Sequence, residues 1–380
     1  MQEGVTLVTK NKIEKHGIDV SLLGFGCMRY PTVDGKIDEA HAEKMLDAAY
    51  AAGINYFDTA YPYHNGESEP FTGKILNKYP RESYYLATKL PCWLVETLDD
   101  AKRLFEEQLK RLDKDYVDFY LLHALGKERW EKMRDLGVVE YLDEMKAAGK
   151  IKYLGFSFHD EYEVFEDIVM YKDWDFCQIQ LNFMDADEQA GMKGYKLCEE
   201  RNIPMVIMEP IKGGLLANLP EEVAKTFKDV DPNMSNAGWA LKWVASLPNV
   251  KVVLSGMSSY DQLTDNLDTF TDFEVMTDEE NAAVDKVAAT LKSRVKNGCT
   301  GCRYCMPCPA GVNIPENFKL WNRYGIYENA GDAKWHWNND ISESQKASNC
   351  IKCGKCEKAC PQKLAIREDL EKVTECFANL

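Results

Sequence analysis

Short apolar segments alternate with longer amphipathic segments along residues 20–290 of the chain. The segment 21–28, SLLGFGCM, is almost continuously apolar, which is typical of a strand buried in a parallel sheet. The amphipathic segment 38–52 has helical periodicity, with Asp38 as a cap and Gly53 beyond the last turn. The pattern predicts strands at residues 21–28, 54–58, 84–89, 116–123, 152–157, 176–181, 204–208 and 251–254.

This alternation predicts an α/β fold, a (β/α)8 TIM barrel, preceded by a hairpin over residues 5–20. After a helix expected at residues 277–296, cysteine, proline and glycine replace the alternating pattern. We therefore expect two domains, a barrel over 1–296 and a small, mainly helical domain over 297–380.

Four polar residues stand at or just beyond three successive predicted strands: Asp58, Tyr63, Lys89 and His123. The C-terminal ends of the strands share one face of a parallel barrel, and that face holds the chemistry. Taken singly, each residue has a plainer explanation, such as a salt-bridged Asp, a surface Tyr or Lys, or a core His. Their succession along the strands favours a common site.

The four side chains together suit the protonation of a carbonyl oxygen. A phenol has a pKa near ~10, so Tyr63 is a weak acid unless its anion is stabilised. A neighbouring Lys89 would stabilise that anion, and Asp58 would hold the ammonium charged and in place. His123 can orient the substrate oxygen with a hydrogen bond.

The segment 57–69, FDTAYPYHNGESE, followed by ATK and LLH, resembles the aldo-keto reductase family over roughly residues 5–290. The resemblance implies a TIM barrel, a nicotinamide cofactor and reduction of a carbonyl substrate. It also implies that Asp58, Tyr63, Lys89 and His123 are the catalytic tetrad.

The same resemblance implies residues for the cofactor. Ser157 and Gln178 match the family's carboxamide-binding positions, although Phe158 stands where an asparagine is usual. Met208 takes the place of the aromatic residue that stacks on the nicotinamide. The expected pyrophosphate loop contains Pro210, Gly213, Gly214 and Leu215, and the expected adenosine end contains Ser255, Gly256, Gln262, Asp265 and Asn266.

The adenosine end suggests a coenzyme preference. Family members that prefer NADP carry Lys or Arg where this chain has Gly256 and Gln262, and Asp265 lies close by. A phosphate without a cationic partner and beside a carboxylate is poorly bound. Of NAD(H) and NADP(H), we therefore expect NAD(H) to be favoured.

Eight of the 13 cysteines form two clusters near the C-terminus. The second is spaced as in bacterial two-cluster ferredoxins, and the first resembles it with a last gap one residue short. Paired zinc sites of four cysteines each are the alternative, but the double CxxC spacing with a fourth cysteine before proline favours two [4Fe–4S] clusters. In such ferredoxins the fourth cysteine serves the other cluster, so the expected sets are Cys299, Cys302, Cys305 and Cys360, and Cys350, Cys353, Cys356 and Cys308.

The net charge of −16 argues against nucleic acid and anionic membranes as partners. The apolar runs are strand-length and residues 1–10 lack a signal pattern, so we expect a cytoplasmic protein. The expected partners are a small-molecule carbonyl substrate, which the family resemblance implies, and a redox partner protein. The resemblance to aldo-keto reductases implies that the segment after the last barrel helix crosses the barrel mouth. Because this segment leads into the cysteine-rich domain, the clusters are expected beside the active-site face.

Two other functions remain open from the sequence. One is a ferredoxin-linked or flavin-dependent oxidoreductase, because a nicotinamide passes electrons in pairs and a cluster passes them singly. The other is an electron-carrier module whose barrel has lost catalysis, against which the complete tetrad argues. An apolar or aromatic substrate is suggested by four residues expected in loops over the site: Trp93, Leu125, Trp130 and Phe158.

Overall fold

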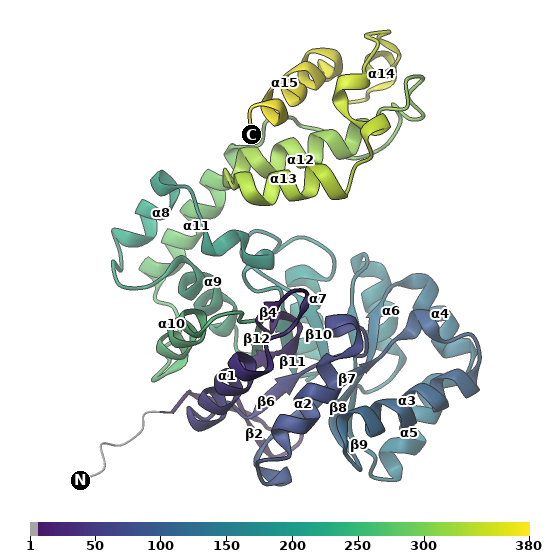
Figure 1. Ribbon diagram of the computed structural model, residues 1–380, viewed down its shortest axis with the longest axis vertical. Coiled ribbons are helices and arrows are strands. Elements are labelled where there is room, and N and C mark those ends of the chain that lie inside the picture. Colours follow the sequence, from purple (N-terminus) through teal and green to yellow (C-terminus); the bar gives the residue numbers. More distant parts are fainter. Residues whose placement is uncertain (1–6) are drawn as a thin grey trace. The chain divides into compact units, whose positions relative to one another are not determined.

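The structure of the protein is a computed structural model. It describes residues 7–380, and the chain separates into two compact units. The first unit, residues 7–213 with 237–278, contains a closed barrel of eight parallel strands, as the sequence predicts (Figure 1). Strand β12 pairs with β3 and closes the ring. In barrel order from β3 the strands are β3 (Leu23–Gly26), β6 (Tyr56–Asp58), β7 (Tyr85–Leu90), β8 (Val117–Leu125), β9 (Ile151–Phe158), β10 (Phe176–Gln180), β11 (Met205–Met208) and β12 (Val250–Ser255).

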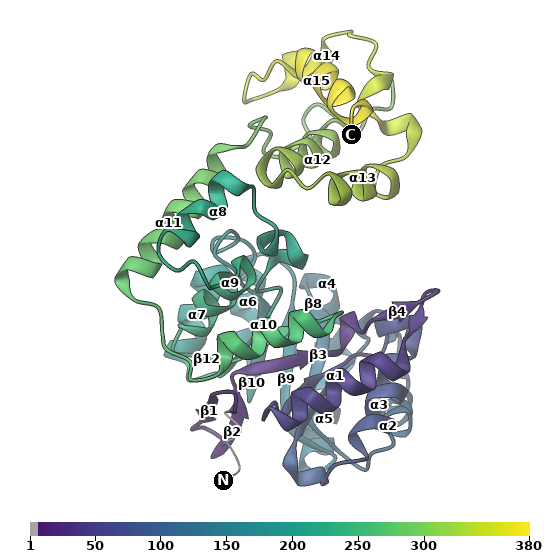
Figure 2. The same cartoon turned by 60° about the vertical axis from the view of Figure 1, so that its left-hand side comes forward.

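Amphipathic helices surround the strands, and α1 and α10 run side by side on the outside of the barrel (Figure 2). Asp38 caps α1 as expected, since its carboxylate accepts a hydrogen bond from the His41 amide at 3.2 Å. The sequence pattern did not predict α4 (Lys127–Asp135), α10 (Tyr260–Phe270) or the small hairpin of β4 (Thr32–Val33) and β5 (Lys36–Ile37). The helices are α1 (Glu39–Ala51), α2 (Ser68–Leu76), α3 (Leu98–Leu112), α4 (Lys127–Asp135), α5 (Val138–Ala147), α6 (Tyr162–Tyr171), α7 (Gly191–Glu200), α9 (Asn236–Ala245) and α10 (Tyr260–Phe270).

An N-terminal hairpin of β1 (Lys10–Ile13) and β2 (Ile18–Ser21) precedes the barrel. Its Ile13 and Val20 belong to the same buried cluster as Tyr56 and Phe119, which point into the barrel. The hairpin therefore adds to the packed interior, while the opposite strand ends are left for polar side chains. Residues 5 and 6 of the expected hairpin lie outside the described residues.

The second unit, residues 214–236 with 279–380, is mainly helical. Its apolar core contains Ile314, Phe318 and Leu370, and six of the eight clustered cysteines pack against it. The expected boundary between residues 296 and 297 stays a prediction. The helices are α8 (Glu221–Lys228), α11 (Asp278–Ser293), α12 (Ile314–Tyr327), α13 (Ala330–Asn339), α14 (Lys355–Ala359) and α15 (Ile366–Ala378). Among residues 7–380, no helix is long and apolar enough to cross a membrane.

Candidate active site and iron–sulfur centre

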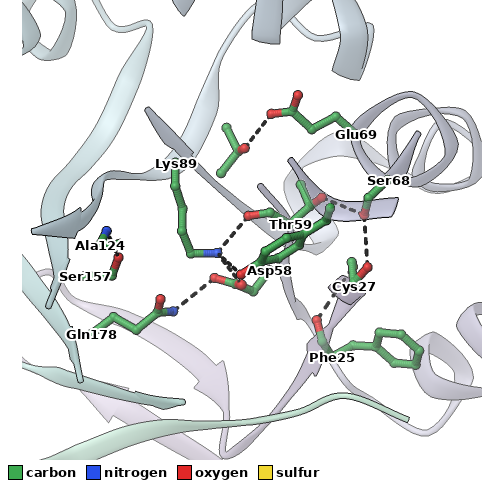
Figure 3. Close-up of polar contacts among 12 residues, drawn as sticks. Phe25, Cys27, Asp58, Thr59, Ser68, Glu69, Lys89, Ala124, Ser157 and Gln178 are labelled. Atoms are coloured by element: carbon green, nitrogen blue, oxygen red, sulfur yellow. Dashed lines mark hydrogen bonds and ion pairs between the residues drawn. The ribbon is translucent and has the colours of Figure 1, made fainter. Parts of the chain in front are cut away.

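A buried ion pair joins the ends of two neighbouring strands. Asp58 is the last residue of β6 and Lys89 lies near the end of β7. The Lys89 ammonium is 2.5 Å from the Asp58 carboxylate and donates a second hydrogen bond to the Thr59 carbonyl at 2.8 Å (Figure 3). Burial opposes the charge on Lys89, but Asp58 outweighs it and raises the pKa of the ammonium above its usual value. Lys89 is therefore a fixed cation.

Tyr63 presents its phenol to this cation. It begins a short 3-10 helix, Tyr63–Gly66, and its hydroxyl lies 3.5 Å from Lys89 Nζ. Burial raises the pKa of the Tyr63 phenol, and the pull of Lys89 in the opposite direction does not cancel the increase. Tyr63 is therefore neutral and holds a proton next to a positive charge.

His123 lies on β8, the strand next to β7, and completes the group of four. Its ring lies edge-on to Tyr63, with ring centroids 6.1 Å apart, and the Trp93 ring is 5.1 Å away on another side. Its Nδ1 is buried without a hydrogen-bond partner. Burial, and after it the charge of Lys89, lowers the pKa of His123 well below its usual range. The ring is therefore a neutral imidazole that can donate one hydrogen bond.

A second buried polar group, which the sequence pattern did not indicate, links α2, β7 and α3. The Glu69 carboxylate is fully buried and accepts hydrogen bonds from Thr88 and Gln108, both at 2.6 Å. Gln108 also donates to the Lys89 carbonyl at 2.9 Å, which fixes the backbone that carries the cation. A polar residue in the apolar stripe of α3 was the available sequence signal for Gln108.

The expected nicotinamide residues lie on three adjacent strands. Ser157 and Gln178 are register partners on β9 and β10, and both are buried. Gln178 donates to the second Asp58 oxygen at 3.1 Å, and Ser157 accepts from the Ala124 amide at 2.7 Å (Figure 3). Met208 ends β11 and is half-buried. Polar atoms and a thioether therefore gather at the same ends of the strands as the tetrad.

Arg29, which the sequence pattern did not indicate, lies beside the expected adenosine residues. Ser255 accepts a hydrogen bond from Asn266 at 2.6 Å, and Gln262 accepts one from the Ser258 amide at 2.7 Å. A Cβ added at Gly256 would lie 2.7 Å from Cγ of Arg29, so Arg29 occupies the space that a longer residue at 256 would need. Asp265 lies on α10 beside Asn266. The signal for Arg29 was its place directly after the first barrel strand.

The expected pyrophosphate loop runs through a 3-10 segment, Lys212–Ala217. Gly213 and Gly214 have φ angles of 65° and 102°, which favour glycine over residues with a side chain. Pro210 and Leu215 are buried. Pro210 and Gly213 belong to the first unit, whereas Gly214 and Leu215 belong to the second.

The expectation of four apolar residues in loops over the site is largely wrong. Leu125, Trp130 and Phe158 are buried in the main hydrophobic core. Trp130 in addition donates to Asp167 at 2.8 Å, which ties it to α6. Trp93 alone of the four is exposed, by 38%, and it packs against His123.

The clustered cysteines of the second unit line two adjoining cavities, each of about 330 Å³ including the space open to solvent. Apolar side chains such as Ile314 complete the walls of both, and Cys305 borders both. The last cysteine of each run lines the cavity that is lined by the first three cysteines of the other run. The first cavity is lined by Cys299, Cys302, Cys305 and Cys360, and the second by Cys305, Cys308, Cys350, Cys353 and Cys356.

The cysteines surround these cavities instead of converging on a point. Within residues 7–380, no three His, Cys, Asp or Glu side chains are close enough to hold a single metal ion. A mononuclear zinc site requires its sulfurs at about 2.3 Å from one centre. The arrangement therefore fits a larger inorganic group better than zinc.

Comparison with known protein families finds a match for the barrel and another for the cysteine-rich segment. The model of the aldo/keto reductase family matches residues 22–289, and that of a 4Fe-4S dicluster domain matches residues 298–365. The chain belongs to the aldo/keto reductase family. This membership identifies it as an oxidoreductase, and the family uses a nicotinamide cofactor.

Individual proteins and solved structures are also similar to this chain over about seven-tenths of its length. The uncharacterized oxidoreductase YqkF of Bacillus subtilis is 28% identical over 291 residues, which is 68% of this chain and 90% of that protein. The aldo-keto reductase AKR11C1 of Bacillus halodurans, in its holo form, superposes with a TM-score of 0.63 at 28% identity, over 74% of this chain and 96% of that one. An aldo-keto reductase of Klebsiella pneumoniae in complex with NADPH shares the fold at 22% identity and a TM-score of 0.61, covering 74% of this chain and 96% of that one.

The neutral state of His123 has a measurable consequence for stability. Its folded pKa lies below 6.5, the ordinary value, so the unfolded chain takes up the proton first as pH falls. The stability that this histidine contributes is present above pH 6.5 and is lost as pH falls toward the folded pKa, by at most ~1.4 kcal/mol per pH unit. Denaturant titrations from pH 7.5 down to pH 5.5 should show a smaller loss for His123→Asn than for the parent. Equal slopes would contradict the neutral assignment.

Proposed function

We propose that the barrel reduces the carbonyl group of a small aldehyde or ketone to an alcohol, with Asp58, Tyr63, Lys89 and His123 as its catalytic residues. The observation that carries this proposal is the buried contact of a carboxylate, an ammonium and a phenol at the C-terminal ends of the strands. This face is where TIM-barrel enzymes hold their reacting groups.

Each side chain has a role that follows from its charge. The neutral Tyr63 hydroxyl gives its proton to the substrate oxygen, and the Lys89 cation stabilises the phenolate that is left. Asp58 keeps Lys89 charged and in place. The neutral His123 ring donates a hydrogen bond that orients the substrate oxygen. The nicotinamide coenzyme, when bound, supplies the hydride.

We propose that Ser157, Gln178 and Met208 meet the nicotinamide end of the coenzyme. Gln178 already donates to Asp58, so one amide would connect the cofactor end to the ion pair. The pyrophosphate is assigned to Pro210, Gly213, Gly214 and Leu215, and the adenosine to Ser255, Gly256, Gln262, Asp265 and Asn266.

Tyr63→Phe should lower kcat by about 10²–10⁴-fold with the fold intact, because the proton donor is lost. Lys89→Met should have nearly as large an effect, because the phenolate is no longer stabilised. The measurement is coenzyme oxidation with a panel of aldehydes and ketones. Tyr61→Phe is the matched control, since the Tyr61 hydroxyl bonds to Glu107 on α3 and should not affect turnover. Near-full turnover of Tyr63→Phe would sink the assignment.

For the coenzyme we propose NAD(H) over NADP(H), by more than about tenfold in affinity. Support comes from Gly256 and Gln262 at the positions where a phosphate would need cations, with Asp265 close by. Arg29 is the feature that opposes the proposal, because its side chain packs on Gly256. Titration of both coenzymes against the parent and Arg29→Gln decides the question. Tighter binding of NADPH that is lost in Arg29→Gln would overturn the preference and identify Arg29 as its cause.

We propose two [4Fe–4S] clusters in the cysteine-rich unit. One would be held by Cys299, Cys302, Cys305 and Cys360, and the other by Cys350, Cys353, Cys356 and Cys308. The lining of the two cavities supports this crossed assignment, because Cys360 lies with the first run and Cys308 with the second.

Iron and acid-labile sulfide should each be about eight per chain. Cys360→Ser should impair the cluster of the first run and destabilise the unit, because cluster binding and folding are coupled. Cys376→Ser is the matched control, since Cys376 lines neither cavity. About four of each element, zinc in place of iron, or equal iron loss in both variants would defeat the proposal.

A further inference from the structure

The segment that carries the second cysteine run has the opposite charge to the chain as a whole, although one of its cations, Lys352, is paired with Glu371. Residues 350–367 contain five Lys or Arg and a single Glu, in a chain of net charge −16. We name the exposed cations of this surface the basic rim. It consists of Arg303, Lys352, Lys355, Lys358, Lys363 and Arg367.

The basic rim lies at the cavities themselves. Arg303 lines the first cavity and Arg367 lines the second. Lys355 and Lys358 lie on α14, which also carries Cys356. The single Glu357 is held by Arg367 in an ion pair at 2.8 Å. In residues 7–380, no ion-pair partner is found for the ammonium groups of Lys355, Lys358 and Lys363, so their charges are available.

Exposed apolar residues lie within the same surface. Tyr304 is 70% exposed between Cys302 and Cys305, and Ile351 is 66% exposed between Cys350 and Cys353. Cys302 and Cys353 are themselves exposed. Each cavity therefore reaches the surface beside a large apolar residue and a cation, which is the composition of a protein interface with electrostatic steering.

We propose that the basic rim, with Tyr304 and Ile351, docks an acidic electron-carrier protein. Charge complementarity selects an acidic partner, and the two apolar side chains favour a protein over a polyanion. The exposed cysteines select a carrier of single electrons, because that is the chemistry of the clusters proposed for these cavities. The inference rests on those clusters and is independent of the proposed carbonyl reduction.

The test compares two carriers of opposite charge with the iron-loaded full-length protein. An acidic plant-type [2Fe–2S] ferredoxin and the basic cytochrome c are titrated by anaerobic calorimetry at low and high salt. The net charge of −16 alone favours cytochrome c, whereas the basic rim favours the ferredoxin. We expect ferredoxin binding at low salt that weakens steeply as salt rises.

Charge-reversed variants then locate the surface. The triple variant Lys355→Glu, Lys358→Glu, Lys363→Glu should weaken ferredoxin binding about tenfold or more. The control carries the same charge change on exposed barrel lysines, as Lys44→Glu, Lys110→Glu, Lys196→Glu, and should bind almost as well as the parent.

Iron content is measured first in every protein, so failure of the cluster proposal is seen separately from failure of docking. If the triple variant loses iron, Lys-to-Gln substitutions at the same positions replace it. Absence of ferredoxin binding, equal weakening in both triple variants, or tighter binding of a DNA oligonucleotide than of the ferredoxin would overturn the proposal.

Discussion

The candidate active site at the end of the barrel strands depends on the buried ion pair between Lys89 and Asp58. Two charges removed from water are stable only when they are paired and their remaining hydrogen-bonding capacity is satisfied. Thr59 and Gln178 supply the additional hydrogen bonds, one to the ammonium and one to the carboxylate. Removal of either charge would leave the other buried without its partner, so this pair is both a structural requirement and the source of the site's electrostatics.

The protonation states of the neighbouring groups follow from that pair and from burial. Burial keeps the proton on Tyr63, and burial together with the Lys89 charge keeps His123 neutral. The candidate site therefore holds one fixed cation and two neutral hydrogen-bonding groups. Charge is distributed differently in the second unit, where exposed cations surround cavities lined by cysteines.

Features encoded locally were predictable from the sequence. The apolar segments predicted the eight barrel strands. The polar residues at the strand ends indicated Asp58, Lys89 and His123 as candidate site residues. Contacts between segments that are distant in the sequence were not predictable in this way. The bond from Gln108 to the Lys89 carbonyl, and the packing of Arg29 on Gly256, depend on how remote segments meet. For the same reason Leu125, Trp130 and Phe158 were misjudged, because an apolar residue near a strand end can belong to the site or to the core.

Deuterium transfer tests the central claim most directly. The iron-loaded protein would be given nicotinamide coenzyme deuterated at C4 together with a panel of aliphatic and aromatic aldehydes, and the alcohols analysed by mass spectrometry. The two hydrogens at C4 of the reduced coenzyme are labelled in separate samples. The account predicts that one of the two samples gives an alcohol with one deuterium on the former carbonyl carbon, and that the other sample gives none. The account would be contradicted if the alcohol carried no deuterium with either labelled coenzyme, or if no aldehyde in the panel gave an alcohol.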